Sequence, residues 1–217
     1  ASAVFALGWL LFGSLAPGST QSSIVLTAPR QSLLHGPASI TTYLHLPLIR
    51  QSPGELAVNL QDRDVSLSFY QEHYAAWENA VIDWTGDHAS CDPGSTSLEF
   101  RAAVLHRINY FRAMAGLPAR VTFSADFNAK AQAAALMMSA NNSLSHTPPS
   151  TWIYYTVDGA EAAASSSLHL GSTGADAVSA YMQDSGGNNA PVGHRRWALY
   201  PQTQTMGTGD VPGGTLN

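Results

Sequence analysis

Apolar side chains recur at helical spacing in the middle of the chain. One such stripe, with intervals of three or four residues, consists of Phe100, Val104, Ile108 and Phe111. Thr96 and Glu99 have the spacing of a capping box, which is typical of a helix N-terminus. Gly116 and Pro118 are typical of a helix end. The pattern predicts a helix that begins at Thr96 and ends before Gly116.

An aromatic stripe with the same period precedes this helix. Its members are Tyr70, Tyr74, Trp77, Val81 and Trp84. Intervals of four and three residues place them on one helical face, and Gly86 is a plausible end for such a helix. Aromatic stripes of this kind are more often packing faces than ligand sites, so the interpretation is a packing helix.

Two further helices and two strands are predicted in the second half. A long helix starts near Ser124 and runs to Asn141-Asn142, with Ala129, Ala133 and Ala140 at spacings that allow close packing on a neighbouring backbone. A short helix spans residues 175–184, and residues 151–157 and 205–211 have strand composition. Helices between isolated strands, without regular βαβ alternation, indicate an α+β fold with a small antiparallel sheet.

The chain divides into four segments by composition. Residues 3–16 are an apolar run, too short for a membrane span of ~20 residues and followed by Pro17 and Gly18. The run is typical of a signal-peptide core, so residues 1–16 are interpreted as a signal-peptide remnant, with a buried helix as the alternative. Residues 17–55 are predicted to be a linker or loose extension, 56–95 a helical extension and 96–217 the main domain.

Charge and cysteine content narrow the function classes. The formal net charge is -5 and Lys130 is the only lysine, so no basic surface for nucleic acid is expected. Cys91 is the only cysteine, which excludes an internal disulfide and any CxxC motif. Cys91 is interpreted as inert, with a reactive or intermolecular role as the alternative.

Three short segments carry side chains suited to metal binding. They are LSH with His146, GAEAA with Glu161 and VGHRRW with His194. Two imidazoles and a carboxylate are a suitable ligand set for zinc or another divalent ion, with a water in the open position. Their separations are too long for one local metal loop, so the alternative of ordinary surface histidines stays open.

The order of these segments resembles the CAP superfamily, the cysteine-rich secretory proteins, antigen 5 and pathogenesis-related proteins, in its bacterial SCP-like extracellular form. The helix AVLHRINYFRAMAGLP and the segment NNSLSH are similar to the opening of that domain, and MGTGDV to its Gly-rich strand. GAEAA resembles the family's Gly-Glu-Asn signature, although Ala162 replaces the Asn, and VGHRRWALYP resembles its second histidine motif. The resemblance implies an α-β-α sandwich around an antiparallel sheet.

The resemblance also implies a cleft with two histidines and two acids that can hold zinc. His146, Glu161 and His194 match family positions, and Asp184 in YMQD is the candidate for the second acid, with helix capping or surface charge as the alternative. Of the other histidines, His106 is expected to be solvated. His88 and His169 could approach the cleft, whereas Arg195 and Arg196 are expected to pair with surface acids. Because family members place another strand after the Gly-rich one, the domain is expected to be truncated at its C-terminus with an exposed sheet edge.

Three functions follow from this resemblance. The preferred one is a secreted extracellular binding module for a small lipid-like ligand, a cell-envelope component or a protein partner, with no nucleic acid and no stable membrane span. The second is a zinc-dependent hydrolase, with Glu161 as general base if it is not a ligand. The third is a structural domain of the cell envelope whose cleft is vestigial. No organic cofactor motif and no GxSxG or HExxH sequence is present.

Overall fold

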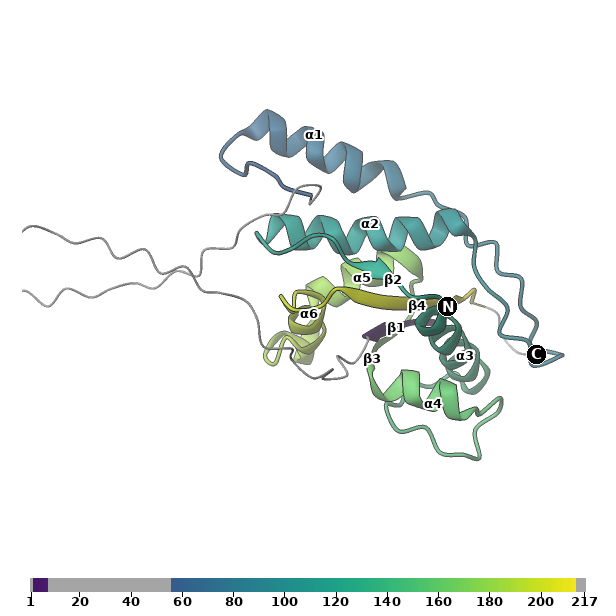
Figure 1. Ribbon diagram of the computed structural model, residues 1–217. Helices are drawn as coiled ribbons and strands as arrows, with labels where there is room; N and C mark the ends of the chain where they lie inside the picture. The colour runs from purple at the N-terminus through teal and green to yellow at the C-terminus, as the bar shows by residue number, and fades with distance from the viewer. Residues whose placement is uncertain (1, 8–55, 214–217) are drawn as a thin grey trace, which may run out of the picture. The chain divides into compact units, whose positions relative to one another are not determined.

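The computed structural model describes residues 2–7 and 56–213, which form an α+β fold of helices around one small sheet (Figure 1). The helices are α1 (Arg63–His73), α2 (Leu98–Met114), α3 (Ala125–Asn141), α4 (Val157–Ala164), α5 (Gly174–Gln183) and α6 (Gly193–Ala198), with short 3-10 helices η1 (Ala75–Trp77) and η2 (Gly186–Asn189). The strands are β1 (Ser2–Leu7), β2 (Thr122–Phe123), β3 (Ser166–Leu170) and β4 (Thr205–Val211). The predicted fold class is confirmed.

The sheet has the strand order β2-β4-β1-β3. β1 pairs antiparallel with both β4 and β3, which agrees with the predicted antiparallel sheet, although neither β1 nor β3 was predicted as a strand. β2 pairs with β4 in parallel over two residues, so the sheet is mixed at that edge. On the side of β4 away from β1, β2 pairs only with Thr205 and Met206, so among the described residues positions 207–211 of β4 have no strand neighbour on that side.

The first residues were interpreted above as part of a signal peptide. In the structure Ser2–Leu7 form the strand β1 within the sheet. The signal-peptide interpretation of residues 1–16 stays a prediction. Residues 8–55, which include the rest of the apolar run and the predicted linker, lie outside the described residues.

Helix layers cover both faces of β4. Met206 packs in one apolar cluster with side chains of α2 and α5, whereas Val211 packs in another with side chains of α3 and α4. Successive strand residues point to opposite faces, so even-numbered positions of β4 face one layer and odd-numbered positions the other. This arrangement is the predicted α-β-α sandwich.

Helix α3 lies directly on the backbone of β4. A Cβ atom added to Gly209 would come within 2.2 Å of backbone atoms of Ala131 and Gln132, and one on Gly207 within 2.5 Å of Phe127. The prediction of close packing is confirmed for Ala133, whose backbone lies against Gly159 of α4, and Ala140 is buried. Ala131 is buried among the contact residues, whereas Ala129 is exposed.

Helix boundaries agree closely with the local signals in the sequence. Ser97 rather than Thr96 caps α2, because the Ser97 hydroxyl accepts the Phe100 N–H over 3.0 Å. The cap at Ser124 and the end at Asn142 confirm the predicted α3. The short predicted helix corresponds to α5, displaced by one residue at each end.

The single helix predicted for the aromatic stripe is wrong after residue 77. α1 ends at His73 and η1 at Trp77, and Val81 is exposed. The reason is a competing set of backbone hydrogen bonds, since Ser97 bonds the carbonyl oxygens of Val81 and Ile82 over 2.8 and 2.9 Å. These bonds attach Val81 and Ile82 to the segment just before α2, so the helix does not continue through them.

The strand predicted at residues 151–157 is also wrong. Trp152 and Tyr155 close consecutive turns, and α4 starts at Val157 behind the cap Thr156. Trp152, Tyr154 and Tyr155 pack against the core cluster formed by α3 and α4. Their aromatic composition therefore reflects packing of a turn region, which β-propensity does not distinguish from a strand.

Candidate functional site around His194

His194 is held in place by a buried carboxylate. Asp184 ends α5 in the left-handed conformation, with φ 47°, and its side chain is fully buried. One of its oxygens lies 2.7 Å from Nδ1 of His194, and the other accepts the backbone N–H of Arg195 over 3.0 Å. Asp184 thus fixes the first turn of α6 and the imidazole together.

This contact decides which ring nitrogen of His194 is available. A carboxylate only accepts hydrogen bonds. Nδ1 of His194 therefore carries the ring proton and donates a hydrogen bond to Asp184. Nε2 is then the nitrogen with a free lone pair in the neutral ring. Metal-binding and proton-transferring histidines commonly have one nitrogen held in this way. Asp184, predicted as a weaker ligand, lies behind His194 with both oxygens in hydrogen bonds.

Tyr181 connects His194 to a second histidine. Its ring centroid lies 5.2 Å from that of His194 and 5.9 Å from that of His169 on β3. Burial raises the pKa of Tyr181 well above its usual value, with the carboxyl of Asp210 acting in the same direction, and its hydroxyl donates to the Ser167 carbonyl over 3.0 Å. Burial also lowers the pKa of His169, and His194 adds to that effect. Both effects favour the neutral form of His169.

His146 has a comparable arrangement in another part of the fold. Its Nδ1 lies 2.8 Å from the carbonyl oxygen of Ala163 on α4. A carbonyl oxygen only accepts, so Nδ1 donates and Nε2 is again the free nitrogen. The imidazole itself is exposed.

Glu161 forms an ion pair with Lys130, the only lysine of the sequence. Its Oε2 lies 3.0 Å from Nζ of Lys130, and Asp158 lies 3.8 Å from the same Nζ. The hydrogen bond that Nζ of Lys130 donates to Glu161 raises the pKa of Lys130. The carboxylate is 63% exposed, so this is a surface ion pair rather than a buried acid–base group.

The predicted ligands do not form one coordination shell in this arrangement. Within residues 2–7 and 56–213, no three His, Cys, Asp or Glu side chains lie close enough to hold a metal ion. The donor chemistry of His146 and His194 suits a divalent ion, but Glu161 is paired with Lys130 and Asp184 with His194. We therefore assign no reaction step to a metal ion shared by these residues.

Three other sequence-based expectations are corrected. His106, expected to be solvated, is half-buried and stacked on Trp77 at a centroid distance of 4.1 Å. Arg195 donates to the carbonyl oxygens of Met182 and Gln183 at the end of α5 instead of pairing with a surface acid. His88 contacts Trp84 in the loop before α2, with ring centroids 5.3 Å apart and planes tilted by 59°.

The sequence analysis missed Asp210, the buried carboxylate of β4. Oδ1 of Asp210 accepts the backbone N–H of Gly174 over 2.8 Å, and Oδ2 accepts the Thr208 hydroxyl over 3.0 Å. Burial raises the pKa of Asp210 to about 6, against the opposite effect of these two hydrogen bonds. A charged residue between apolar positions of a central strand is the signal that indicates such a site.

The sequence model of the CAP family, the cysteine-rich secretory protein family, matches residues 105–217. The chain belongs to this family. Comparison with curated protein sequences and with solved structures gives no match. CAP domains are typically extracellular, and among the described residues no helix is long and apolar enough to cross a bilayer. Despite the family name, the single cysteine of this CAP domain, Cys91, is exposed, free and outside the matched residues.

Proposed function

We propose that this CAP domain is an extracellular binding module that contacts its ligand through Nε2 of His194. The observation that carries this proposal is the 2.7 Å contact between the buried Asp184 and Nδ1 of His194. Burying the carboxylate of Asp184 is costly unless hydrogen bonds compensate the loss of water. Here the carboxylate is fully buried and orients the imidazole of His194, whose side chain is 28% exposed. Such an arrangement presents the free nitrogen of His194 to solvent in a fixed orientation.

The ligand class that suits this surface is a divalent metal ion of the zinc type, or a molecule that carries one. His169 supplies a second imidazole, which also packs against the Tyr181 ring and is close enough to His194 for that residue to lower its pKa. Imidazole nitrogens suit zinc, and histidine ligands usually donate their other N–H to a carboxylate or a carbonyl. Two protein donors leave positions for donors of the bound molecule, which fits a binding module better than a closed structural site.

Zinc titration by calorimetry tests this proposal. We expect His194→Ala and His169→Ala each to weaken zinc binding at least about tenfold, and Asp184→Asn to weaken it about 10- to 100-fold. His88→Ala, in a different loop, is the matched control and should bind as the parent does. Zinc affinity that is unchanged by His194→Ala contradicts the proposal. Equal losses from His146→Ala and Glu161→Gln would instead support the shared site predicted from the sequence.

A hydrolase is the second candidate, because the same contact is also the geometry of a general base. A carboxylate that holds Nδ1 of a histidine leaves Nε2 able to take a proton from water or from a hydroxyl group. In that case turnover of ester or amide substrates should be lost in His194→Ala while the fold is retained. A parent protein that binds zinc without turnover of such substrates favours the binding module.

A further inference from the structure

An aromatic interface attaches the segment before the family-matched region to α2. This segment, residues 56–77, contains α1 and η1 and is called the α1 arm. Phe69 stacks on Tyr110 with ring centroids 5.6 Å apart, and Tyr74 meets Tyr110 edge to face at 5.1 Å. Trp77 stacks on His106 with ring centroids 4.1 Å apart and an interplanar angle of 14°. His106 is thus the titratable member of an otherwise aromatic contact surface on α2.

His106 lies in a stack of three nearly parallel rings. Its plane makes 14° with Trp77 and 14° with His73, whose ring centroid is 6.1 Å away. Nδ1 of His106 and Nδ1 of His73 are both buried and have no hydrogen-bond partner among the described residues. A neutral imidazole can leave Nδ1 as a bare lone pair, but a protonated one must bury an N–H without an acceptor.

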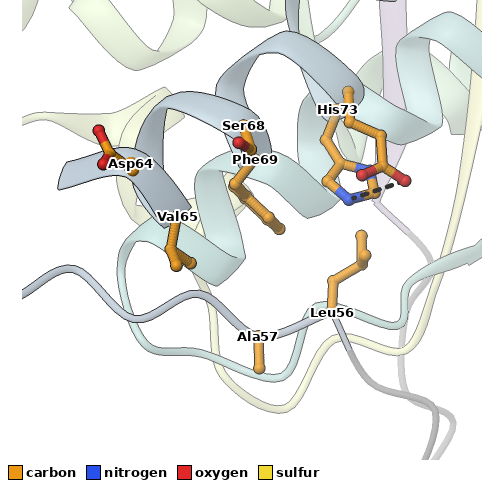
Figure 2. A pocket seen from close by; sticks show the side chains of 8 residues that line it. Leu56, Ala57, Asp64, Val65, Ser68, Phe69 and His73 are labelled. Atoms are coloured by element: carbon orange, nitrogen blue, oxygen red, sulfur yellow. Dashed lines mark ion pairs between the residues drawn. The ribbon is translucent and has the colours of Figure 1, made fainter. Parts of the chain in front are cut away.

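The charged groups around this stack shift the pKa of His106 in both directions. Burial lowers the pKa of His106, His73 on α1 lowers it further, and Glu72 on α1 opposes both. Glu72 also lies 3.8 Å from Nε2 of His73, the ion pair drawn in Figure 2. On α2, the neighbouring Arg107 is directed to the Tyr74 ring and to Ser179, and Glu78 after η1 is exposed.

We propose that the α1 arm is a proton-released latch: it stays docked on α2 while His106 is neutral and comes off when His106 is protonated. Two costs of protonation favour release, namely electrostatic repulsion from His73 and the buried N–H without an acceptor. The face of Trp77 attracts a cation and works against release. The burial of Nδ1 of His106 and Nδ1 of His73 outweighs this attraction, because undocking exposes both nitrogens to water.

The direction of the pH effect follows from the proton count. Because the pKa of His106 is lowered in the docked state, the undocked arm binds more protons below the ordinary histidine value of about 6.5. Docking is therefore strongest above that pH and weakens as the pH falls through it. The groove of about 570 Å³ that Leu56, Phe69 and His73 help to line belongs to the α1 arm alone and would move with it (Figure 2).

Hydrogen exchange of the full chain at pH 7.5 and 5.0, corrected for intrinsic rates, tests the latch. We expect protection of residues 63–77 to fall at least about threefold more in the parent than in His106→Phe, which keeps a flat ring on Trp77 but cannot be protonated. His88→Phe, at a histidine whose ring packs against Trp84, is the control and should follow the parent. An equal loss in the parent and in His106→Phe overturns the proposal.

A histidine titration by NMR keeps the test decisive if His106→Phe fails to dock. The proposal requires the His106 resonance of the parent to titrate below the ordinary histidine value, together with exchange broadening of signals from the α1 arm. Titration at or above that value means that attraction to the Trp77 face exceeds the cost of burial. That result also overturns the proposal.

Discussion

Nη1 of Arg112 on α2 donates to the carbonyl oxygen of Ala198, the last residue of α6, over 3.0 Å. The same guanidinium donates to the carbonyl oxygens of Tyr200 and Thr203, and its Nε to that of Pro118. Arg112 is fully buried, so its charge is compensated by backbone carbonyls around it. Helix α2 thus determines where α6, and with it His194, is placed.

Replacing Arg112 by Met should therefore destabilise the fold and loosen α6. Four carbonyl acceptors lose their donor in a buried setting, for which we expect a loss of about 3–5 kcal/mol in the free energy of unfolding. Urea unfolding followed by circular dichroism measures this loss. Arg196→Met, at an exposed position of the same α6, is the control and should change stability by less than about 0.5 kcal/mol.

Asp184→Asn should change the tautomer of His194 and weaken the start of α6. An amide can present its NH₂ to Nδ1, which lets the proton move to Nε2 and removes the free lone pair from the solvent side. Nitrogen chemical shifts of the His194 ring report this directly. We expect mainly Nδ1–H in the parent and a mixed or reversed population in the variant. Unchanged ring shifts would contradict the orienting role of Asp184.

Asp210 should make the domain more stable in mild acid than at neutral pH. Its folded-state pKa of about 6 lies above the ordinary value of 3.8, so between these values the folded protein holds a proton that the unfolded chain releases. The contribution is fully present below about pH 4 and is lost as the pH rises through 6. At pH 7.5 the penalty amounts to at most about 3 kcal/mol.

The matched variant for this prediction is Asp210→Asn, which keeps an acceptor for the Gly174 N–H. We expect it to be about 1–3 kcal/mol more stable than the parent at pH 7.5 and nearly equal to it at pH 4.5. Thermal unfolding at both pH values makes the comparison. A variant that is less stable at both would show that the ionised carboxylate is favourable at the start of α5.

Gly209→Ala should be among the most damaging single changes in β4. The added methyl group would lie 2.2 Å from backbone atoms of Ala131 and Gln132, which no side-chain rotation relieves. We expect a loss of at least about 3 kcal/mol, measured by thermal unfolding, or failure to fold. Gly187→Ala is the control, because no heavy atom lies within 4 Å of its added Cβ.

The helices were predictable because their signals are local. Ser124 caps α3 by accepting the Phe127 N–H, and Gly116 follows α2 in a left-handed conformation, with φ 68°. Alternate glycines at 207 and 209 also indicate a smooth strand face on which a helix backbone can lie, a pattern visible in the sequence alone. The end of α1 was missed because the bonds between Ser97 and the carbonyl oxygens of Val81 and Ile82 are not local.

The candidate site was predictable in part. The sequence selects His194 and Asp184, but their relationship depends on the left-handed turn at Asp184, which brings the carboxylate under a helix ten residues further on. The approach of His169 depends on its packing against Tyr181, and no spacing of histidines shows that. The ion pair between Glu161 and Lys130 joins α4 to α3, and it could not be predicted from the sequence either.

The direct contact of α3 with the glycines of β4 limits how the two histidine regions can move. A helix and a strand that touch backbone to backbone cannot slide without steric overlap, so α3 and β4 behave as one rigid block. His146 extends from one end of this block on the segment between α3 and α4, and His194 belongs to α6, which is joined to β4 by residues 199–204. Any change in the separation of the two imidazoles must therefore come from these connecting segments and not from the sheet.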